Sequence, residues 1–470
     1  MKDNIIQHQV DHIVETFNFT NEQFDIFNKL DYDIKETIYN NKASIRLLSG
    51  AAGTGKTYLL SHLIEYLSLS YSVTVTAPTH KALSVIEQSF LDIKKSSIKF
   101  KTIHSFLNIK LIRDFTTGIE SFKVDNYKSI VNTDILVIDE SSMIGEELFR
   151  YIKDALDENK VKFILFVGDM YQLPPVENGA NVLFSSGIKE YKLIEIVRQA
   201  KDSSIINIAT QLRELIKNKQ KINIEDIFSK QKHIEVEYFY DREDFHNNFC
   251  KNNNWAEENK IIASFTNKSV DEHNDIIRNR YWMEQEKREH AFFFVGERLT
   301  IQAGYRTNKD EILLNNQDIV LAYVKKEFLE DIGTYIWVCK DKEQNLIYIV
   351  DPQSKIIHQN FLDDTVQKIN ISPQAKRKEM WEDFFNFKYS FASVKYPYAS
   401  TIHKLQGSTF ETIYIDLAEI INSSKHLSSE QLYRLLYVAI TRASRELKIL
   451  LPISVSNEIS ILKENLKRTI

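Results

Sequence analysis

Cysteine, glycine and long apolar runs are all scarce in this chain of 470 residues. The two cysteines, Cys250 and Cys339, are too few for a disulfide framework or a cysteine metal cluster, which favours a reducing compartment and predicts a cytoplasmic protein. No apolar run approaches the roughly 20 residues that a membrane-spanning helix needs. The polar N-terminal segment also lacks the apolar core of a signal peptide. These absences argue against a disulfide-stabilised secreted domain, and we expect no membrane partner.

The charge balance is close to neutral, with 60 Lys and Arg against 65 Asp and Glu and a formal net charge of −5. This balance argues against a basic coat over the whole surface. It leaves room for a local basic groove, because the field near a site depends on the distribution of charge. The 43% hydrophobic and 27% charged residues are typical of a globular protein, and the length predicts more than one core.

Only 12 glycines are present, yet Gly50, Gly53 and Gly55 fall in one loop that fits the pattern G-x-x-x-x-G-K-[ST]. Phosphate oxygens must be approached by bare backbone N–H groups, which side chains would block. Lys56 supplies a positive charge for the β- and γ-phosphates, and Thr57 supplies a hydroxyl for Mg²⁺. We therefore expect ATP and Mg²⁺ as cofactors. The predicted ATP-binding residues of the loop are Gly50, Ala51, Ala52, Gly53, Thr54, Gly55, Lys56 and Thr57.

Continuous apolar runs of strand length alternate with helical patterns in two parts of the chain. The predicted strands are 44–50, 72–78, 134–140 and 162–169 in the first part, and 261–267, 412–418 and 446–452 in the second. Strands that are apolar throughout are buried on both faces, as in parallel sheets covered by helices. Residues 1–42 are predicted to be helical, and residues 291–395 are predicted to form an all-β insertion into the second part.

Further residues are candidates for chemistry at the phosphates. Asp139 and Glu140 follow a predicted strand, where a P-loop enzyme needs a carboxylate for its metal ion. We therefore assign Asp139 to Mg²⁺ through water, and Glu140 as the base or the group that orients the attacking water. Gln172 follows another strand on a loop stiffened by prolines, and it is either a sensor of the γ-phosphate or part of a surface turn. Arg198 and Arg442 are candidate arginine fingers, although their spacing alone does not separate them from surface arginines.

Seven segments resemble the motifs of superfamily 1 helicases and follow the order of that family. They are APTHKAL (77–83), TIHSFL (102–107), DESSM (139–143), GDMYQLPPV (168–176), SFTNKSVDEHN (264–274), ASTIHKLQGST (399–409) and LLYVAITRA (435–443). The set is most similar to the RecD-like branch, and within it to the Dda-like phage helicases. The resemblance covers roughly residues 20–450.

This resemblance implies an α/β fold with two RecA-like parallel-sheet motor domains, a small β-hairpin insertion and an SH3-like β-rich accessory domain. The expected ranges are 1–200 for the first motor domain with its pin hairpin at about 107–130, 201–290 with 396–470 for the second, and 291–395 for the accessory domain.

The resemblance also assigns roles to individual residues. Gln23 matches a glutamine that reads adenine, and Arg198 and Arg442 match two arginine contacts to the γ-phosphate. Val197 stands where many relatives place an aromatic ring under adenine, so that contact is not expected here. The expected DNA-binding residues are Pro78, Thr79, His80, Thr102, His104, Phe106, Thr401, His403 and Lys404. The candidate strand-separation residues of the pin are Phe115 and Phe122.

The resulting interpretation is an ATP-dependent DNA helicase and single-stranded DNA translocase, with 5′→3′ polarity given by the resemblance alone. Its expected partners are single-stranded and forked duplex DNA, together with proteins of replication or recombination, and we expect a monomer. Two alternatives remain from the residues themselves. One is a P-loop ATPase that acts on RNA or protein, and the other is a nucleotide-gated module that binds single strands.

Overall fold

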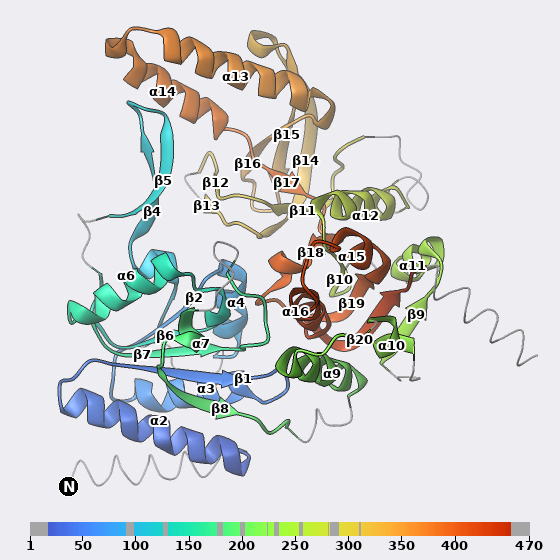
Figure 1. Cartoon of the computed structure of the whole chain (residues 1–470). Coiled ribbons are helices and arrows are strands. Elements are labelled where there is room, and N and C mark those ends of the chain that lie inside the picture. Colours follow the sequence, from blue (N-terminus) through green and yellow to red (C-terminus); the bar gives the residue numbers. More distant parts are fainter. Residues whose placement is uncertain are drawn as a thin grey trace, which may run out of the picture.

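The computed structural model describes residues 17–90, 98–125, 130–175, 182–197, 203–222, 224–229, 235–252, 257–280, 282, 291–309 and 312–452. Two parallel sheets form the lower part of the molecule in Figure 1, and an antiparallel sheet, two helices and a long hairpin rise above them. The predicted helices of residues 1–42 are described from residue 17 on, where α2 spans Asn21–Tyr39.

The first sheet has the strand order β3-β2-β6-β7-β1-β8, and all its neighbouring strands are parallel. Leu47 and Leu48 are adjacent on β1, are both buried, and face different hydrophobic cores on the two sides of the sheet. This two-sided burial explains the continuous apolar runs. The elements are β1 (Ser44–Gly50), α3 (Lys56–Ser68), β2 (Val73–Ala77), α4 (His80–Gln88), β3 (Ile98–Thr102), α5 (Ile103–Phe106), β6 (Thr133–Ile138), α6 (Glu146–Asp157), β7 (Val161–Gly168), α7 (Val182–Ser185) and β8 (Lys189–Leu193).

The second sheet has the order β18-β10-β19-β20-β9 and is also parallel throughout. Its largest core joins the sheet to α9, α10, α15 and α16. The elements are α9 (Ser204–Asn218), α10 (Ile224–Ser229), β9 (Val236–Phe239), α11 (Arg242–Phe249), β10 (Lys260–Ser264), α12 (Asn267–Asn279), β18 (Ala399–Thr401), β19 (Phe410–Asp416), α15 (Leu417–Ser423), α16 (Ser429–Ile440) and β20 (Ala443–Leu450). The prediction of two parallel α/β sheets is therefore confirmed.

A third, antiparallel sheet, here called the accessory sheet, has the order β16-β15-β14-β11-β17. Its strands lie between α12 and β18 in the chain. They are β11 (Arg298–Ile301), β14 (Asp318–Leu329), β15 (Thr334–Asp341), β16 (Leu346–Val350) and β17 (Val394–Lys395), and the short pair β12 (Tyr305–Arg306) and β13 (Ile312–Leu313) accompanies them.

The expectation of an all-β insertion is wrong for its C-terminal part. Residues 355–388 form the helices α13 (Lys355–Ile371) and α14 (Gln374–Lys388), which pack against each other at the top of Figure 1. Leu362, Ile369, Trp381 and Phe385 make a small core of their own. The spacing of seven residues between Leu362 and Ile369 and of four between Trp381 and Phe385 is the helical pattern.

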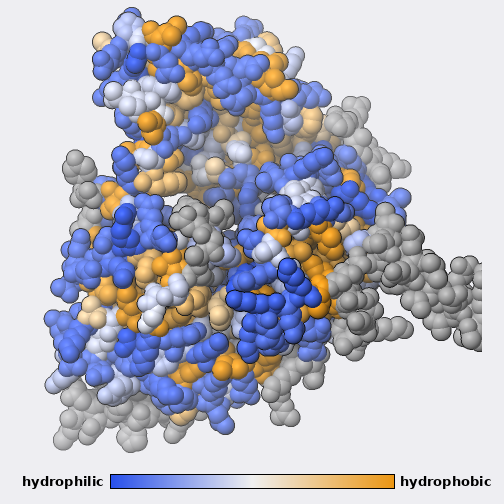
Figure 2. Space-filling model, viewed as in Figure 1, coloured by the Kyte–Doolittle hydropathy of each residue, from blue (hydrophilic) through white to orange (hydrophobic). Residues whose placement is uncertain are grey.

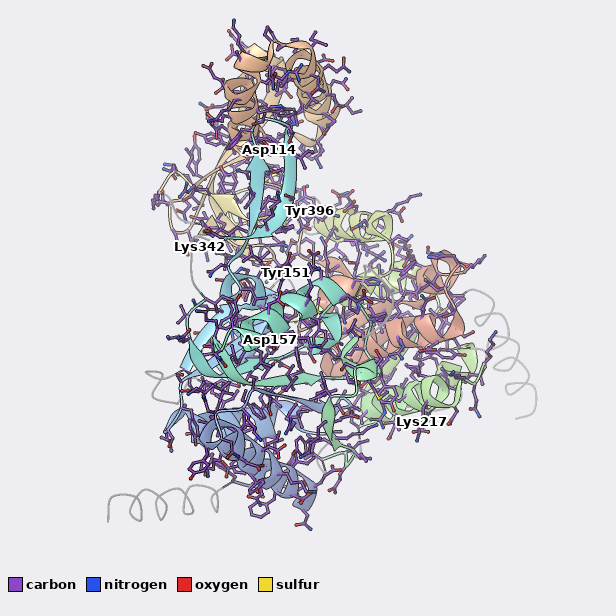
Figure 3. All side chains as sticks on the ribbon, turned by 60° about the vertical axis from the view of Figure 1, so that its left-hand side comes forward. Asp114, Tyr151, Asp157, Lys217, Lys342 and Tyr396 are labelled. Atoms are coloured by element: carbon purple, nitrogen blue, oxygen red, sulfur yellow. The ribbon has the colours of Figure 1, made fainter. Side chains whose placement is uncertain are left out.

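The hairpin consists of β4 (Ile109–Asp114) and β5 (Ile119–Val124), paired from Ile109 opposite Val124 to Asp114 opposite Ile119. Figure 3 labels Asp114 near its tip, which lies beside α14. Glu120 on β5 accepts hydrogen bonds from the hydroxyl of Tyr389 at 2.6 Å and from Lys388 Nζ at 3.2 Å. The tip is thus fixed to the helices of the insertion.

Gly118 closes the turn of the hairpin with a φ of +72°, and a Cβ there would lie 2.3 Å from the Trp381 ring. Both the conformation and the contact therefore require glycine.

Among the described residues, no helix combines the length and the apolar character that a membrane span needs.

We predict that Gly118→Ala destabilises the docked hairpin by more than the backbone strain alone. Gly187 is a matched control, because it has the same φ of +72° and a Cβ added there would meet no heavy atom within 4 Å. Gly187→Ala should therefore cost only the left-handed strain, about 1–2 kcal/mol. Hydrogen exchange of the β4–β5 amides should accelerate in Gly118→Ala and remain unchanged in Gly187→Ala. Equal protection in both variants would contradict the packing of the tip against Trp381.

Candidate nucleotide site and nucleic-acid interface

The phosphate-binding loop connects the end of β1 to the start of α3. Lys56 Nζ donates hydrogen bonds to the carbonyl oxygens of Gly50 at 2.6 Å and Ala51 at 3.1 Å, so its charge lies within the loop. Thr54 is buried and its hydroxyl donates to Ala51 O at 2.8 Å, whereas Thr57 is exposed at the first turn of α3. The loop therefore presents an ammonium group and a free helix N-terminus, the features that bind phosphate.

Gln23 of α2 packs directly on this loop. Its side-chain Nε2 donates to Thr54 O at 3.2 Å, and its Oε1 accepts from Thr20 N at 3.0 Å as part of a capping box. Gly55 has a φ of +74°, and a Cβ there would lie 2.3 Å from Gln23 Nε2. Val197 N donates to Gly53 O at 2.9 Å, which places the non-aromatic residue of the expected adenine site beside the loop.

Asp139 and Glu140 follow β6 at the same edge of the sheet. Burial, followed by the neighbouring charge of Glu140, raises the pKa of Asp139 to about 7. Glu140 has a φ of +50°, which is uncommon for a residue other than glycine, and its carboxylate lies 3.9 Å from the guanidinium of Arg442. A buried carboxylate of raised pKa is a group that a cation would stabilise.

One helix of the second sheet, α16, reaches the P-loop of the first. The hydroxyl of Tyr437 accepts a hydrogen bond from Ala52 N at 2.9 Å and donates one to Asp169 Oδ2 at 2.5 Å. Burial, followed by the charge of Asp169, raises the pKa of Tyr437 well above its usual value, so the hydroxyl keeps its proton. Tyr437 was not among the predicted site residues, although a tyrosine within the apolar run 435–440 could have indicated a buried polar contact.

Arg434, one turn earlier on α16, holds the loop that follows β7. Its Nη1 donates to the carbonyl oxygens of Met170 and, at 3.1 Å, Gln172. The Gln172 side chain is only 7% exposed, and its Oε1 has no hydrogen-bond partner among the described residues. Gln172 is therefore not part of an exposed turn, and its role as a sensor of the γ-phosphate stays a prediction.

Arg442 follows α16 and is buried at the boundary between the sheets. Its Nη1 donates to Ser408 O at 3.2 Å, and its Nε donates to Val438 O at 3.3 Å. These bonds hold the guanidinium near Glu140. Arg198, the other predicted arginine contact, lies outside the described residues.

The predicted DNA-binding residues fall into exposed and buried groups. His80, His104, His403 and Lys404 are exposed, and Pro78 and Thr79 are half-buried, whereas Thr102 and Thr401 are each 8% exposed. The hydroxyls of Thr79 and Thr102 accept hydrogen bonds from the first turns of α4 and α5. Each hydroxyl keeps its own proton for donation to another acceptor.

The prediction that Phe106 binds DNA needs correction. Phe106 is 2% exposed and belongs to the hydrophobic core on the α6 side of the first sheet. Its ring therefore presents no face to a strand.

The two hairpin phenylalanines also differ. Phe122 is 68% exposed, and its ring lies 6.4 Å from that of His104. Phe115 packs on the core of α13 and α14, with its ring 6.0 Å from Phe385. The structure thus brings Phe122, and not Phe115, to an exposed surface next to a predicted strand contact.

Comparison with known proteins agrees with this arrangement. Residues 31–227 match the family model of an AAA domain, and residues 396–450 match that of the UvrD-like helicase C-terminal domain. These matches, together with relatives named as Dda helicase and as RecD subunits of the RecBCD enzyme, confirm the resemblance to superfamily 1 helicases of the RecD-like branch.

Among individual relatives, the chain is similar to the ATP-dependent DNA helicase Dda of Enterobacteria phage T4, at 28% identity over 90% of this chain and 97% of the relative. It is also 25% identical to an uncharacterized protein of Acanthamoeba polyphaga mimivirus, over 88% of this chain and 96% of that one. The crystal structure of Pif1 helicase from Candida albicans matches with a TM-score of 0.47 and 17% identity, over 96% of this chain and 99% of that chain.

We predict that Asp139→Asn stabilises the protein at pH 8 in the absence of nucleotide. The pKa of Asp139 is raised from 3.8 to about 7, so the folded state binds this proton more tightly than the unfolded state. The stabilising contribution of the proton is complete below about pH 4 and is lost as the pH rises to about 7. Asparagine mimics the protonated carboxyl, and the variant should exceed the parent by more than about 1 kcal/mol at pH 8.

Urea unfolding at pH 5 and pH 8 measures this difference, which should shrink at the lower pH. An advantage of the same size at both pH values would contradict the raised pKa.

Proposed function

We propose that the protein is an ATP-dependent DNA helicase that translocates along single-stranded DNA. The observation that carries the proposal is that α16 joins the second sheet to the P-loop of the first, through Tyr437 and Ala52. A nucleotide site shared by two parallel-sheet units can convert nucleotide binding into relative movement of the units. The relative Dda, named as an ATP-dependent DNA helicase, supports the same activity.

We assign the nucleotide site as follows. Lys56 and the loop amides bind the phosphates, Glu140 orients or deprotonates the attacking water, and Gln172 senses the γ-phosphate. Arg442, together with Arg198, stabilises the charge that develops in the transition state. We assign the contact to adenine to Gln23, whose side chain packs on the P-loop.

The donor set fits Mg²⁺, because the exposed Thr57 hydroxyl and the Asp139 carboxylate are hard oxygen ligands. Asp139 and Thr57 would hold this ion, which supplies neutralisation of phosphate charge when bound. No group of three or more His, Cys, Asp or Glu side chains suited to a metal occurs among the described residues, so the remaining ligands would be phosphate and water.

The strand path in this proposal runs over polar groups of both units. His80, His104 and the hydroxyls of Thr79 and Thr102 belong to the first, and Thr401, His403 and Lys404 to the second. Donors of this kind bind phosphate without reading sequence. Pro78 lies beside this path.

We further propose that the ranges 1–200, 201–290 with 396–470, and 291–395 act as first motor, second motor and accessory domain, the last resembling an SH3 fold. We also propose 5′→3′ polarity and forked duplex DNA as a substrate. The proposal further includes association with replication or recombination proteins, a monomeric state and a cytoplasmic location.

We predict that Glu140→Gln retains ATP binding and loses turnover by about 10²–10⁴-fold, because the base is removed while Asp139 remains. Glu146→Gln is the matched control, since this exposed residue of α6 undergoes the same chemical change. Fluorescent nucleotide binding and ATPase rate with saturating single-stranded DNA measure the two steps. Parent-like turnover in Glu140→Gln would contradict its assignment as the base.

Strand separation needs an apolar residue at the fork, and the exposed Phe122 is our candidate. We predict that Phe122→Ala slows the unwinding of forked duplexes about tenfold, since one lost stacking step is about 1.4 kcal/mol. Its single-strand-stimulated ATPase should stay at the parent level.

Phe115→Ala is the control on the same hairpin, because Phe115 packs on α14. It should mainly lower the stability of the docked tip. If Phe122→Ala unwinds like the parent, the hairpin does not separate strands through this ring, and if ATPase falls in step with unwinding, Phe122 belongs to the motor.

A further inference from the structure

A cavity of about 330 Å³ lies where the two parallel-sheet units and the accessory sheet meet. Lys81 comes to it from α4 of the first unit, Arg298 from β11 of the accessory sheet, and Lys404 from the segment after β18 of the second unit. Tyr396, which also lines it, is labelled in Figure 3 between the hairpin and α12. Figure 2 shows the surface hollowed where the upper part of the molecule meets the lower.

Lys81 brings an unsatisfied positive charge to this cavity. Its ammonium lies 4.7 Å from the centre of the Phe410 ring, and within the described part of the chain it has neither a hydrogen bond nor a salt bridge. Burial lowers the pKa of Lys81, and the nearby positive charge of Arg298 lowers it further, whereas the carboxylate of Asp318 raises it. Lys81 is half-buried with the Phe410 ring beside its ammonium, and an anion would offset the cost of this partial withdrawal from water.

Arg298 brings a second cation with a free donor. Its Nε is buried without a hydrogen-bond partner in the described structure, and the nearest carboxylate oxygen, Asp318 Oδ2, is 3.9 Å away. The other oxygen of Asp318 accepts from the Thr300 hydroxyl at 2.6 Å. One carboxylate, already hydrogen-bonded elsewhere, thus faces both Arg298 and Lys81.

The remaining charges of the lining do not fill this need. Lys260 pairs with Glu258 at 2.6 Å, and Lys395 pairs with Asp271 at 2.8 Å. Glu257 adds one further acid to the lining. Lys404 donates to Gln302 Oε1 at 2.7 Å, and burial together with the charge of Lys395 lowers its pKa. With Arg298 facing Asp318 at 3.9 Å, Lys81 and Lys404 are the lining cations for which no salt bridge is seen in the described residues, and Glu257 is the one acid of the lining left over.

We propose that this cavity binds a backbone phosphate of the translocating strand, with Lys81 and Arg298 holding the same phosphate from the first motor unit and the accessory sheet. The proposal rests on the function proposed above, and it assigns strand contacts to two residues outside the predicted set. The cavity is also lined by Thr401 and Lys404 of that set, so it is continuous with the expected path. A phosphate at this junction couples the accessory sheet to every movement between the motor units.

Salt dependence of single-strand binding tests this site. The variants are Lys81→Gln, Arg298→Gln and the double variant, with Lys325→Gln as control, because Lys325 lies on β14 of the same sheet, is 58% exposed and does not line the cavity. The affinity for an oligothymidylate is measured from about 50 to 400 mM NaCl, the range in which phosphate contacts dominate the salt slope. Each lost phosphate contact should make the negative slope of log K against log salt shallower by about 0.7.

We expect the double variant to lose about one contact, since both cations serve one phosphate, while Lys325→Gln matches the parent. Arg298→Lys keeps the charge and should retain most of the parent slope. Thermal unfolding and ATP binding without DNA should stay unchanged in every variant. Parent-like slopes in the double variant overturn the site, and a loss of about two contacts overturns the shared phosphate.

Inorganic phosphate separates a strand phosphate from a free anion. Sodium phosphate should weaken strand binding no more than NaCl of equal ionic strength. Specific competition by phosphate, combined with a parent-like slope in the double variant, assigns the cavity to a free anion and overturns the strand contact. A parent that binds no single strand overturns both this site and the proposed function, whereas a binding parent with unaltered variants overturns only the site.

Discussion

The hydroxyl of Tyr437 is the contact on which the arrangement of the two parallel sheets depends. It joins the backbone of the P-loop to Asp169, and it does so from the core of the second unit, where the ring itself is fully buried. Because the ring cannot move without α16, a displacement of the loop displaces the helix or breaks this hydrogen bond. Arg434 lies within that helix and holds the loop after β7. Arg442 lies just after the helix and faces the carboxylate of Glu140, so the same rigid element positions both groups.

The upper part of the molecule follows a different principle. The β4–β5 hairpin alone is a two-stranded ribbon, and such ribbons are marginally stable in water. Here the carboxylate of Glu120 accepts hydrogen bonds from Arg113, Lys388 and Tyr389. Burial raises the pKa of this carboxyl, but the three partners outweigh burial and leave the pKa lowered. The hairpin belongs to the chain segment of the first parallel-sheet unit, yet its tip packs on the helices of the insertion in the second unit. The two units are therefore connected a second time, far from the nucleotide site.

Much of this architecture was readable from the sequence, and the reasons are local. The central strands β2, β6, β7, β10 and β19 are largely buried on both faces, so their apolar runs could be read from the sequence, whereas the edge strands β3, β8 and β9 carry exposed residues and were not predicted. A P-loop needs specific residues at fixed spacing, so Gly55, Lys56 and Asp139 could be proposed as site residues without coordinates. The helices α13 and α14 were missed because Trp381 and Phe385 occur in an aromatic segment that also suits strands. Phe106 was misplaced because motif order says nothing of the side on which a ring packs.

Contacts between distant parts of the chain could not be predicted in the same way. Tyr437 and Ala52 are far apart in sequence, and an apolar helical pattern predicts burial without naming the partner. The presence of Lys81 and Arg298 in the lining of one cavity depends on how three separate sheets pack. Neither residue carries a local signal, because lysine and arginine on a surface are common.

The position of the insertion has a consequence for biosynthesis. β10 lies between β18 and β19 in the finished sheet, yet both of these neighbours leave the ribosome only after the accessory sheet, α13 and α14 have been made. Until then β10 has two unpaired edges, and its side chains are those of a strand buried on both faces. Unpaired apolar strands of this kind invite association with other chains. The length of the insertion therefore sets how long β10 waits during synthesis for the two strands that cover its edges.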